Sequence, residues 1–221
     1  TLTVNTDATV ADDLTFTASS GTLSVSNSKT LNIADNLILN NNANNSVTAS
    51  ITGSGTLLAS TVIVGPALNP NNNSTRTTTL NSSVSTFTVS NDLEINSYYN
   101  GGNKRNNGVF NLQSGVLTIN GEINTTNENS GNTSTFSMAS GAESGLLKLT
   151  AASPFNLSGQ GTNTINLNGT SAVLEYMGSV NQNALGTTYR TLLINNSNTG
   201  VTLSGNATAA NNGTFSGNGT S

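Results

Sequence analysis

The sequence contains no cysteine, no histidine and no tryptophan, and only 7% of its residues are charged. Without cysteine and histidine the chain has no thiol nucleophile, no Ser-His-Asp triad and no imidazole ligand for a metal ion. The missing cysteine also excludes a disulfide-bonded scaffold and leaves the redox environment undetermined. We therefore predict that the protein is not an enzyme and that it has no metal centre and no cofactor.

Positive charge and long apolar runs are also scarce. Six basic residues face ten acidic ones, which gives a formal net charge of −4 and a pI near 4.5. A nucleic-acid-binding surface needs clustered basic residues, so we expect no nucleic-acid partner. No apolar run is long enough to span a membrane, and no signal peptide is recognisable, so we expect no membrane span in this chain.

The apolar residues that are present follow a strict pattern. They recur as Leu-x-Val, Leu-x-Ile and Phe-x-Leu pairs, the period of two that is typical of half-buried strands. Only 33% of the chain is hydrophobic, which is little for a closed globular core of this length. Stacked coils need fewer apolar residues, because each coil buries a few inward side chains against its neighbours. The pattern predicts an all-β fold and favours a β-solenoid.

One strand–corner–strand unit recurs along the chain. The unit is clearest in the stretch from Phe110 to Ile119, where a Ser-Gly pair separates two alternating segments. We interpret three further stretches as the same unit: Phe16–Val25, Phe136–Gly141 and Phe155–Gly159. Repetition of one unit predicts a single β-helix domain over residues 1–221.

A second kind of corner is built from Asp, Asn or Gly between apolar positions. It occurs in four related octets: Thr9–Phe16, Asn32–Leu39, Thr88–Ile95 and Thr118–Thr125. Short polar side chains and glycine suit sharp corners, because they tolerate a left-handed backbone and hydrogen-bond nearby amides. Two corner types predict a triangular or flattened cross-section. The chain starts and stops within this pattern, so we expect it to be a fragment of a longer repetitive protein.

Two stretches interrupt the rhythm and are predicted to be loops. Gly65–Ser74 contains two prolines, and Ser97–Gly108 gathers tyrosines and basic residues. Because loops carry binding residues more often than regular coils do, the second stretch is the candidate binding site. Its predicted binding residues are Tyr98, Tyr99, Lys104 and Arg105.

The acidic residues lie mostly at the Asx corners, where we expect them to cap turns. Two other uses stay open. Asp12 and Asp13, or Asp92 and Glu94, could offer oxygen ligands to calcium. Stacking of corners could also bring Asp35 near Asp92, as a carboxylate pair for polysaccharide cleavage requires.

Threonine pairs raise one further alternative, an ice-binding face. A flat Thr-x-Thr array on a solenoid can order water, and four pairs have the required form. They do not recur at one fixed place in every coil, which argues against such a face. The pairs are Thr1/Thr3, Thr15/Thr17, Thr86/Thr88 and Thr133/Thr135.

The C-terminal third contains a distinctive series of Tyr, Gly, Gln and Leu residues. Leu174-Glu-Tyr-Met-Gly178 is followed by Gln182, then by Tyr189-Arg-Thr-Leu-Leu-Ile194, and then by Gly200-Val-Thr-Leu-Ser-Gly-Asn206. This arrangement resembles segments of large, repetitive surface proteins of Bacteroidetes-type bacteria. The resemblance implies a right-handed parallel β-helix in an exported, adhesin-like protein, often secreted by the type IX route. It carries no catalytic residues, and the chain departs from it after Asn206.

Together these observations predict a structural or adhesive module of an extracellular bacterial surface protein or filament, which provides reach and display. The expected partners are other surface or matrix components and glycans, and exposed solenoid ends favour end-to-end self-association. Two alternatives remain: a glycan-active β-helix that cleaves or binds polysaccharide, and the passenger region of an autotransporter.

Overall fold

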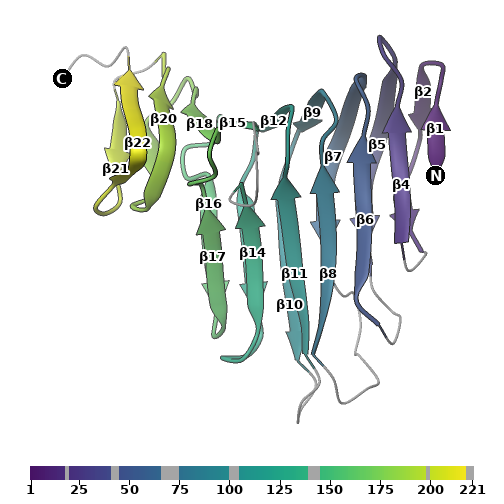
Figure 1. Cartoon of the computed structure of the whole chain (residues 1–221), viewed down its shortest axis with the longest axis horizontal. Coiled ribbons are helices and arrows are strands. Elements are labelled where there is room, and N and C mark those ends of the chain that lie inside the picture. The colour runs from purple at the N-terminus through teal and green to yellow at the C-terminus, as the bar shows by residue number, and fades with distance from the viewer. Residues whose placement is uncertain are drawn as a thin grey trace.

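The computed structural model shows a chain of β-strands wound into one stack of coils (Figure 1). It describes residues 1–17, 20–40, 45–65, 75–99, 105–138, 145–197 and 200–217. Strands of successive coils pair in parallel, so the predicted all-β solenoid is confirmed. Over these described ranges, no helix is long and apolar enough to cross a membrane.

The strands lie on three faces of the solenoid. Face 1 stacks β1 (Leu2–Val4), β4 (Ser20–Val25), β6 (Val47–Thr52), β8 (Thr75–Ser82), β11 (Arg105–Leu112), β14 (Thr133–Ser137) and β17 (Thr162–Asn166). Face 2 stacks β2 (Ala8–Val10), β5 (Thr30–Leu39), β7 (Thr56–Val64), β9 (Thr86–Val89), β12 (Val116–Ile119), β15 (Leu146–Leu149), β18 (Val173–Tyr176), β20 (Thr188–Ile194) and β22 (Thr208–Gly217). Face 3 stacks β3 (Leu14–Phe16), the second halves of β5 and β7, β10 (Leu93–Tyr99), β13 (Ile123–Asn127) and β16 (Phe155–Gly159). A small separate pair joins β19 (Gln182–Ala184) to β21 (Val201–Leu203).

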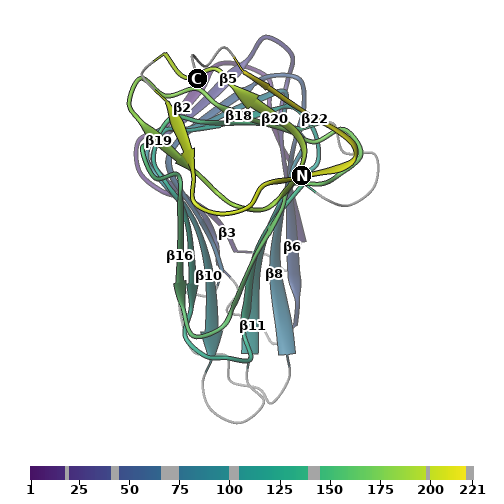
Figure 2. The ribbon, with the colours of Figure 1, turned by 90° about the vertical axis from the view of Figure 1, so that its left-hand side faces the viewer.

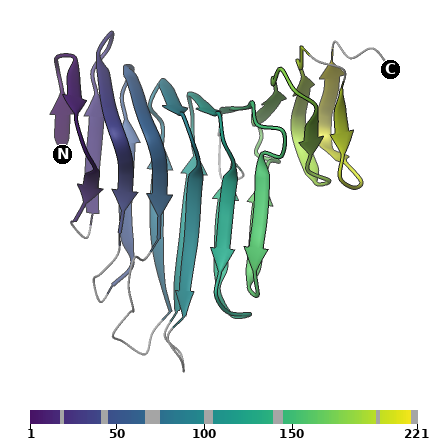
Figure 3. The same ribbon diagram turned by 180° about the vertical axis from the view of Figure 1, so that it is seen from behind.

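The solenoid is right-handed. In Figure 1 the chain advances from the N-terminus at the right to the C-terminus at the left. The strands of face 1 lie on the side nearer the viewer, and they point upward. Seen from behind in Figure 3, the strands of face 3 point downward. A chain that rises on the near side and descends on the far side while moving left traces a right-handed coil. In the end view, faces 1 and 3 form the long sides and face 2 the short top (Figure 2).

The corners between faces 2 and 3 are the predicted Asx corners, and the octets around them stack in register. Their carboxylates bond to the following coil. Asp13 Oδ1 accepts hydrogen bonds from the backbone N–H of Asn36 at 3.1 Å and from its side-chain Nδ2 at 2.8 Å. Asp92 Oδ1 accepts the N–H of Glu122 at 2.7 Å. Both hydrogen bonds run to the turn of the next coil rather than within the aspartate's own turn, so each aspartate ties one coil to the next.

The corners between faces 1 and 2 require glycine. Gly53 and Gly115 have φ values of +108° and +79°, a conformation that side chains disfavour. A Cβ on Gly115 would lie 2.0 Å from the carbonyl oxygen of Val84 in the preceding coil. A Cβ on Gly53 would lie 2.1 Å from the carbonyl oxygen of Val25. The predicted Ser114-Gly115 corner therefore exists because the coils approach each other too closely for a side chain.

The interpretation of the four Phe-containing stretches as one repeated unit is wrong. Phe110 and Phe136 do share a position on face 1, where their rings stack at a centroid distance of 5.6 Å with an interplanar angle of 7°. Phe16 and Phe155 instead lie on face 3. The glycine after Phe16, Gly21, is inside β4 rather than at a corner. The prediction failed because the same local pattern, alternating apolar residues followed by a Ser-Gly pair, occurs at more than one edge of the coil. The pattern therefore does not identify the face on which a strand lies.

The core consists of inward rows that run along the solenoid. On face 2, Phe87, Leu117 and Leu147 are in register and at most 1% exposed. Each fully buried side chain of this size contributes about 1.5–3 kcal/mol. Because every inward position repeats in the next coil, a thin core is enough to hold the coils together. This agrees with the low hydrophobic fraction of the sequence.

The predicted loop Ser97–Gly108 is mostly strand. β10 continues to Tyr99 and β11 begins at Arg105, and the two strands pair antiparallel where face 3 turns into face 1. The first residues of β11 are polar or glycine, so the apolar alternation that marks the other strands is absent there. We call the edge where residues 98–99 pair with residues 105–106, at the bottom of Figure 1, the tip edge. In the other predicted loop, residues 66–74 lie outside the described residues.

Replacing Leu117 with Asp tests the inward assignment. The side chain is fully buried, so an unpaired charge there should cost about 4 kcal/mol or more and unfold the stack. The matched control is Thr118→Asp, an outward, half-buried position beside Lys148. Thermal unfolding followed by circular dichroism should show loss of the transition in the first variant only. Equal stability of both variants would contradict the assignment.

Candidate functional site

The predicted binding residues lie at the tip edge. Tyr98 is opposite Asn106, and Tyr99 is opposite Arg105, in the antiparallel pairing of β10 with β11. The side chains of Tyr98 and Arg105 are half-buried. Lys104 and the side chain of Tyr99 lie outside the described part of the structure. The fold therefore brings the backbone at 98–99 beside that at 105–106, and the binding role of the four residues stays a prediction.

Arg105 has a defined neighbour at this edge. Its guanidinium lies over Gly131 of the next coil, where a Cβ would approach Arg105 Cζ to 2.4 Å. The glycine thus leaves room for the guanidinium, which a larger side chain at position 131 would displace. Arg105 Nε is buried and has no hydrogen-bond partner among the described residues.

A polar interior beneath the tip edge was not foreseen from the sequence. Asn127, 1% exposed, is its centre: its Oδ1 accepts hydrogen bonds from Ser97 Oγ and from Ser134 Oγ, the latter at 3.0 Å. Thr78 Oγ1 donates to Asn106 Oδ1 at 3.0 Å. The period-two pattern contained a signal for this interior. Asn106 and Gly108 occupy the same alternate positions as the buried Phe110, so their side of the strand faces inward.

Several groups in this interior have no partner. Asn106 Nδ2, Thr125 Oγ1 and both amide atoms of Asn132 are buried without a hydrogen bond to any described residue. A buried polar group without a partner costs about 1–3 kcal/mol. The tip edge therefore gains less stability per coil than the apolar rows near face 2.

Asp35 and Asp92, considered as a carboxylate pair for polysaccharide cleavage, do not lie on adjacent coils. The coil of β7 lies between the corners of Asp35 and Asp92, which puts them two rungs, about 10 Å, apart. Asp92 also bonds to the coil on its other side. Asp35 instead gathers with Asp12 and Asp13, whose carboxylate oxygens lie within 4.8 Å of one another. These three exposed carboxylates have the oxygen chemistry that calcium prefers, and two of them are among the calcium candidates of the sequence.

Threonine pairs align only in part. On face 1, Thr-x-Thr pairs of β8, β14 and β17 face outward and form two adjacent columns along the solenoid. Between β8 and β14, β11 interrupts both columns, because Asn107 and Val109 occupy the corresponding positions. The expected lack of a continuous threonine face therefore holds for this face. The aligned pairs are Thr77/Thr79, Thr133/Thr135 and Thr162/Thr164.

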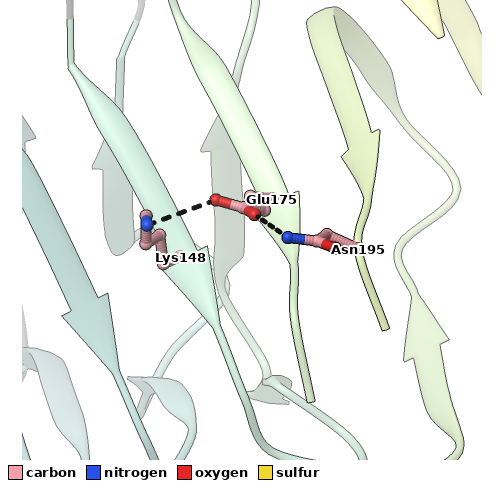
Figure 4. Close-up of polar contacts among 3 residues, drawn as sticks. All are labelled: Lys148, Glu175 and Asn195. Carbon is pink, nitrogen blue, oxygen red and sulfur yellow. Dashed lines mark hydrogen bonds and ion pairs between the residues drawn. The ribbon is translucent and has the colours of Figure 1, made fainter. Parts of the chain in front are cut away.

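One charged cluster lies on the outer side of face 2 (Figure 4). Lys148 Nζ lies 3.5 Å from Glu175 Oε2, and Asn195 Nδ2 donates to Glu175 Oε1 at 2.9 Å. Lys148 and Glu175 are cross-strand neighbours on β15 and β18, and Asn195 follows β20. The cluster links three coils, and its carboxylate is already satisfied, which favours a structural role.

The residues of the surface-protein resemblance pack inside the C-terminal coils. Tyr176 and Tyr189 are fully buried, and both hold the backbone of Leu185. The N–H of Leu185 donates to Tyr176 Oη at 3.0 Å, and Tyr189 Oη donates to the Leu185 carbonyl oxygen. These contacts give the two tyrosines a structural role in the C-terminal coils.

Gln182 joins these coils through four hydrogen bonds and is 1% exposed. Its Oε1 accepts from Gly178 N and from Asn196 Nδ2, both at 2.8 Å. Its Nε2 donates to the carbonyl oxygens of Leu149 and Ala151, both at 3.0 Å. All polar atoms of the side chain are used, so the glutamine is a structural bridge between coils.

Comparison with protein-family models, with curated proteins and with solved structures found no match to this chain.

Burial makes the two tyrosines sensitive to alkali. Loss of hydration, with a further contribution from the charge of Tyr189, raises the pKa of Tyr176, and burial also raises the pKa of Tyr189. In the unfolded chain a tyrosine ionises near pH 10, so ionisation favours unfolding above that pH. The stability contributed by these groups is complete below about pH 10 and is lost as the pH rises further.

We therefore expect alkaline unfolding in which tyrosinate absorbance and loss of the circular dichroism signal rise together. Tyr189→Phe should lower stability at neutral pH by about 1–3 kcal/mol, because the carbonyl of Leu185 loses its donor. In the same variant, alkali should cost less additional stability. Full ionisation of all tyrosines before any change in circular dichroism would contradict this account.

Gln182→Glu should be far more damaging than an ordinary surface change. The new carboxylate would face two carbonyl oxygens and could bond to one of them only when protonated, so we expect a loss of about 3 kcal/mol or more at neutral pH. Its folded-state pKa would be raised, so stability should recover as the pH falls toward 4. The exposed Gln160→Glu serves as the matched control in urea titrations at both pH values. An unchanged midpoint for Gln182→Glu would refute the bridge.

Proposed function

We propose that this chain is a structural and adhesive module of an extracellular bacterial surface protein, which holds a recognition surface away from the cell. The observation that carries the proposal is the unbroken parallel pairing of coil upon coil along face 2, from β2 to β22. Each coil adds about 4.8 Å to a stiff rod of simple construction. Such a scaffold provides distance and display without requiring an active site.

The outer surface supports the same function. The two outward threonine columns of face 1 carry hydroxyl, amide and aliphatic groups and no charge. A neutral, hydroxyl-rich surface stays hydrated without attracting ions or nucleic acid over long distances. This chemistry suits a protein that works outside the cell among matrix components and glycans.

The tip edge is the proposed place of recognition. Tyr98 and Arg105 are half-buried there, and tyrosine and arginine are enriched among the residues that contribute most to binding surfaces. The ends of β8, β10 and β11 lie on the side of the coil opposite to face 2 (Figure 2). A ligand could bind there without displacing the buried apolar side chains of the core.

Polysaccharide cleavage has less support than adhesion. Asp13 and Asp92 at the Asx corners accept hydrogen bonds from the following coil, and Asp35 and Asp92 lie on opposite sides of an intervening coil. We therefore expect no release of reducing ends when the protein is incubated with plant, fungal or bacterial polysaccharides. Such release would favour the glycan-active alternative.

The adhesive role is tested with beads that carry the purified protein, under flow over surfaces coated with matrix proteins or glycans. Replacement of both Tyr98 and Tyr99 with Ala should reduce bead retention several-fold while leaving the melting temperature nearly unchanged. Thr126→Ala, an exposed outward change on face 3, is the control for surface substitution as such. Equal retention of the double variant and the wild type would remove the tip edge as the adhesive surface.

A further inference from the structure

The coils narrow abruptly near the C-terminal end. Face 1 ends at β17 and face 3 ends at β16, whereas face 2 continues through β18, β20 and β22. Figures 1 and 3 show this as a step, with the last coils present only near the top. In the described part of the chain, no further strand pairs with the outer edge of β16.

The step uncovers side chains that every earlier coil hides. Phe155 ends the inward row that contains Leu93 and Ile123, both fully buried. Phe155 itself is half-buried, and Leu157, the next inward residue of β16, is 38% exposed. Two apolar groups thus form a short platform along the uncovered side of one strand.

A pocket of about 250 Å³ lies where this platform meets the C-terminal coils. Phe155 and Leu185 form its apolar part, and Ser153, Asn183 and Ser204 form its polar part. Asn183 Nδ2 donates to Ser153 Oγ at 3.1 Å, and Ser204 Oγ donates to the Ala184 carbonyl oxygen at 2.9 Å. These bonds hold the polar groups at the rim. Pockets for drug-sized ligands measure about 300–1,000 Å³, so this one has room for a single ring-sized group.

The charge of the region restricts the ligand further. No Asp, Glu, Lys or Arg occurs from residue 149 to residue 174, and the pocket residues of the C-terminal coils are also uncharged. The residues that line the pocket therefore offer no counter-charge to an ionic ligand. A neutral ligand with one apolar face and several hydroxyl groups matches an aromatic ring bordered by an amide and two hydroxyls.

We propose that this step is a binding site for a neutral saccharide, with one sugar ring against Phe155 and its hydroxyl groups on Asn183, Ser153 and Ser204. The next ring of an oligosaccharide would lie along β16 over Leu157. An extended peptide could pair with the open edge of β16, but peptide pairing would make no use of the hydroxyl and amide rim. The step lies apart from the tip edge, so this proposal and the adhesive role fail independently.

Saturation-transfer NMR tests the site with the intact chain and neutral oligosaccharides of glucose, mannose, galactose and N-acetylglucosamine. We expect at least one of them to bind, and Asn183→Ala to weaken that binding about tenfold. Phe155→Leu, which keeps an apolar side chain but removes the ring, should weaken it to a similar extent. Asn156→Ala changes an exposed amide on the outward side of the same strand and should bind like the wild type.

Three results would overturn the proposal. The first is no binding of any neutral oligosaccharide to the wild type. The second is binding that survives both Asn183→Ala and Phe155→Leu while circular dichroism shows both variants folded. The third is capture of an alternating apolar peptide by the β16 edge that excludes the oligosaccharide without depending on Asn183.

Discussion

The structure depends on one constraint, the in-register parallel pairing of each coil with the next. Because backbone hydrogen bonds fix the register, an inward residue in one coil must have an inward residue above and below it. The rows of Leu, Ile, Val and Phe follow directly, and a low apolar content is sufficient. The outward columns follow as well, which is why threonines far apart in sequence come to lie side by side on face 1.

The corners exist to keep that register. Where coils approach most closely, only glycine fits, as the short distance from Gly115 to the Val84 carbonyl shows. Where the chain turns between faces 2 and 3, Asp13 and Asp92 bond to the following coil and so add side-chain ties to the backbone ladder. Acidic residues used in this way are committed to structure, which weighs against their use in catalysis.

The two regions most relevant to function are the places where the regular pattern stops. At the tip edge the interior becomes polar, with Asn127 bonded to its neighbours and Asn132 without a partner among the described residues. At the C-terminal step faces 1 and 3 end, the short pair of β19 and β21 lies beside face 2, and Phe155 is left partly uncovered. Both departures place side chains that could recognise a ligand on a scaffold that is otherwise closed and repetitive.

The sequence by itself determined the all-β class, the solenoid and both corner types, because period-two alternation and turn residues act locally. It also located the tyrosines and basic residues of the tip edge, although it mistook two strands for a loop. Only the tertiary structure decided which residues stack, since coils differ in length and even shift register, as between Ile33 and Asn36. The polar interior, the separation of Asp35 from Asp92 and the pocket at Phe155 all depend on that stacking, and no local pattern contains it.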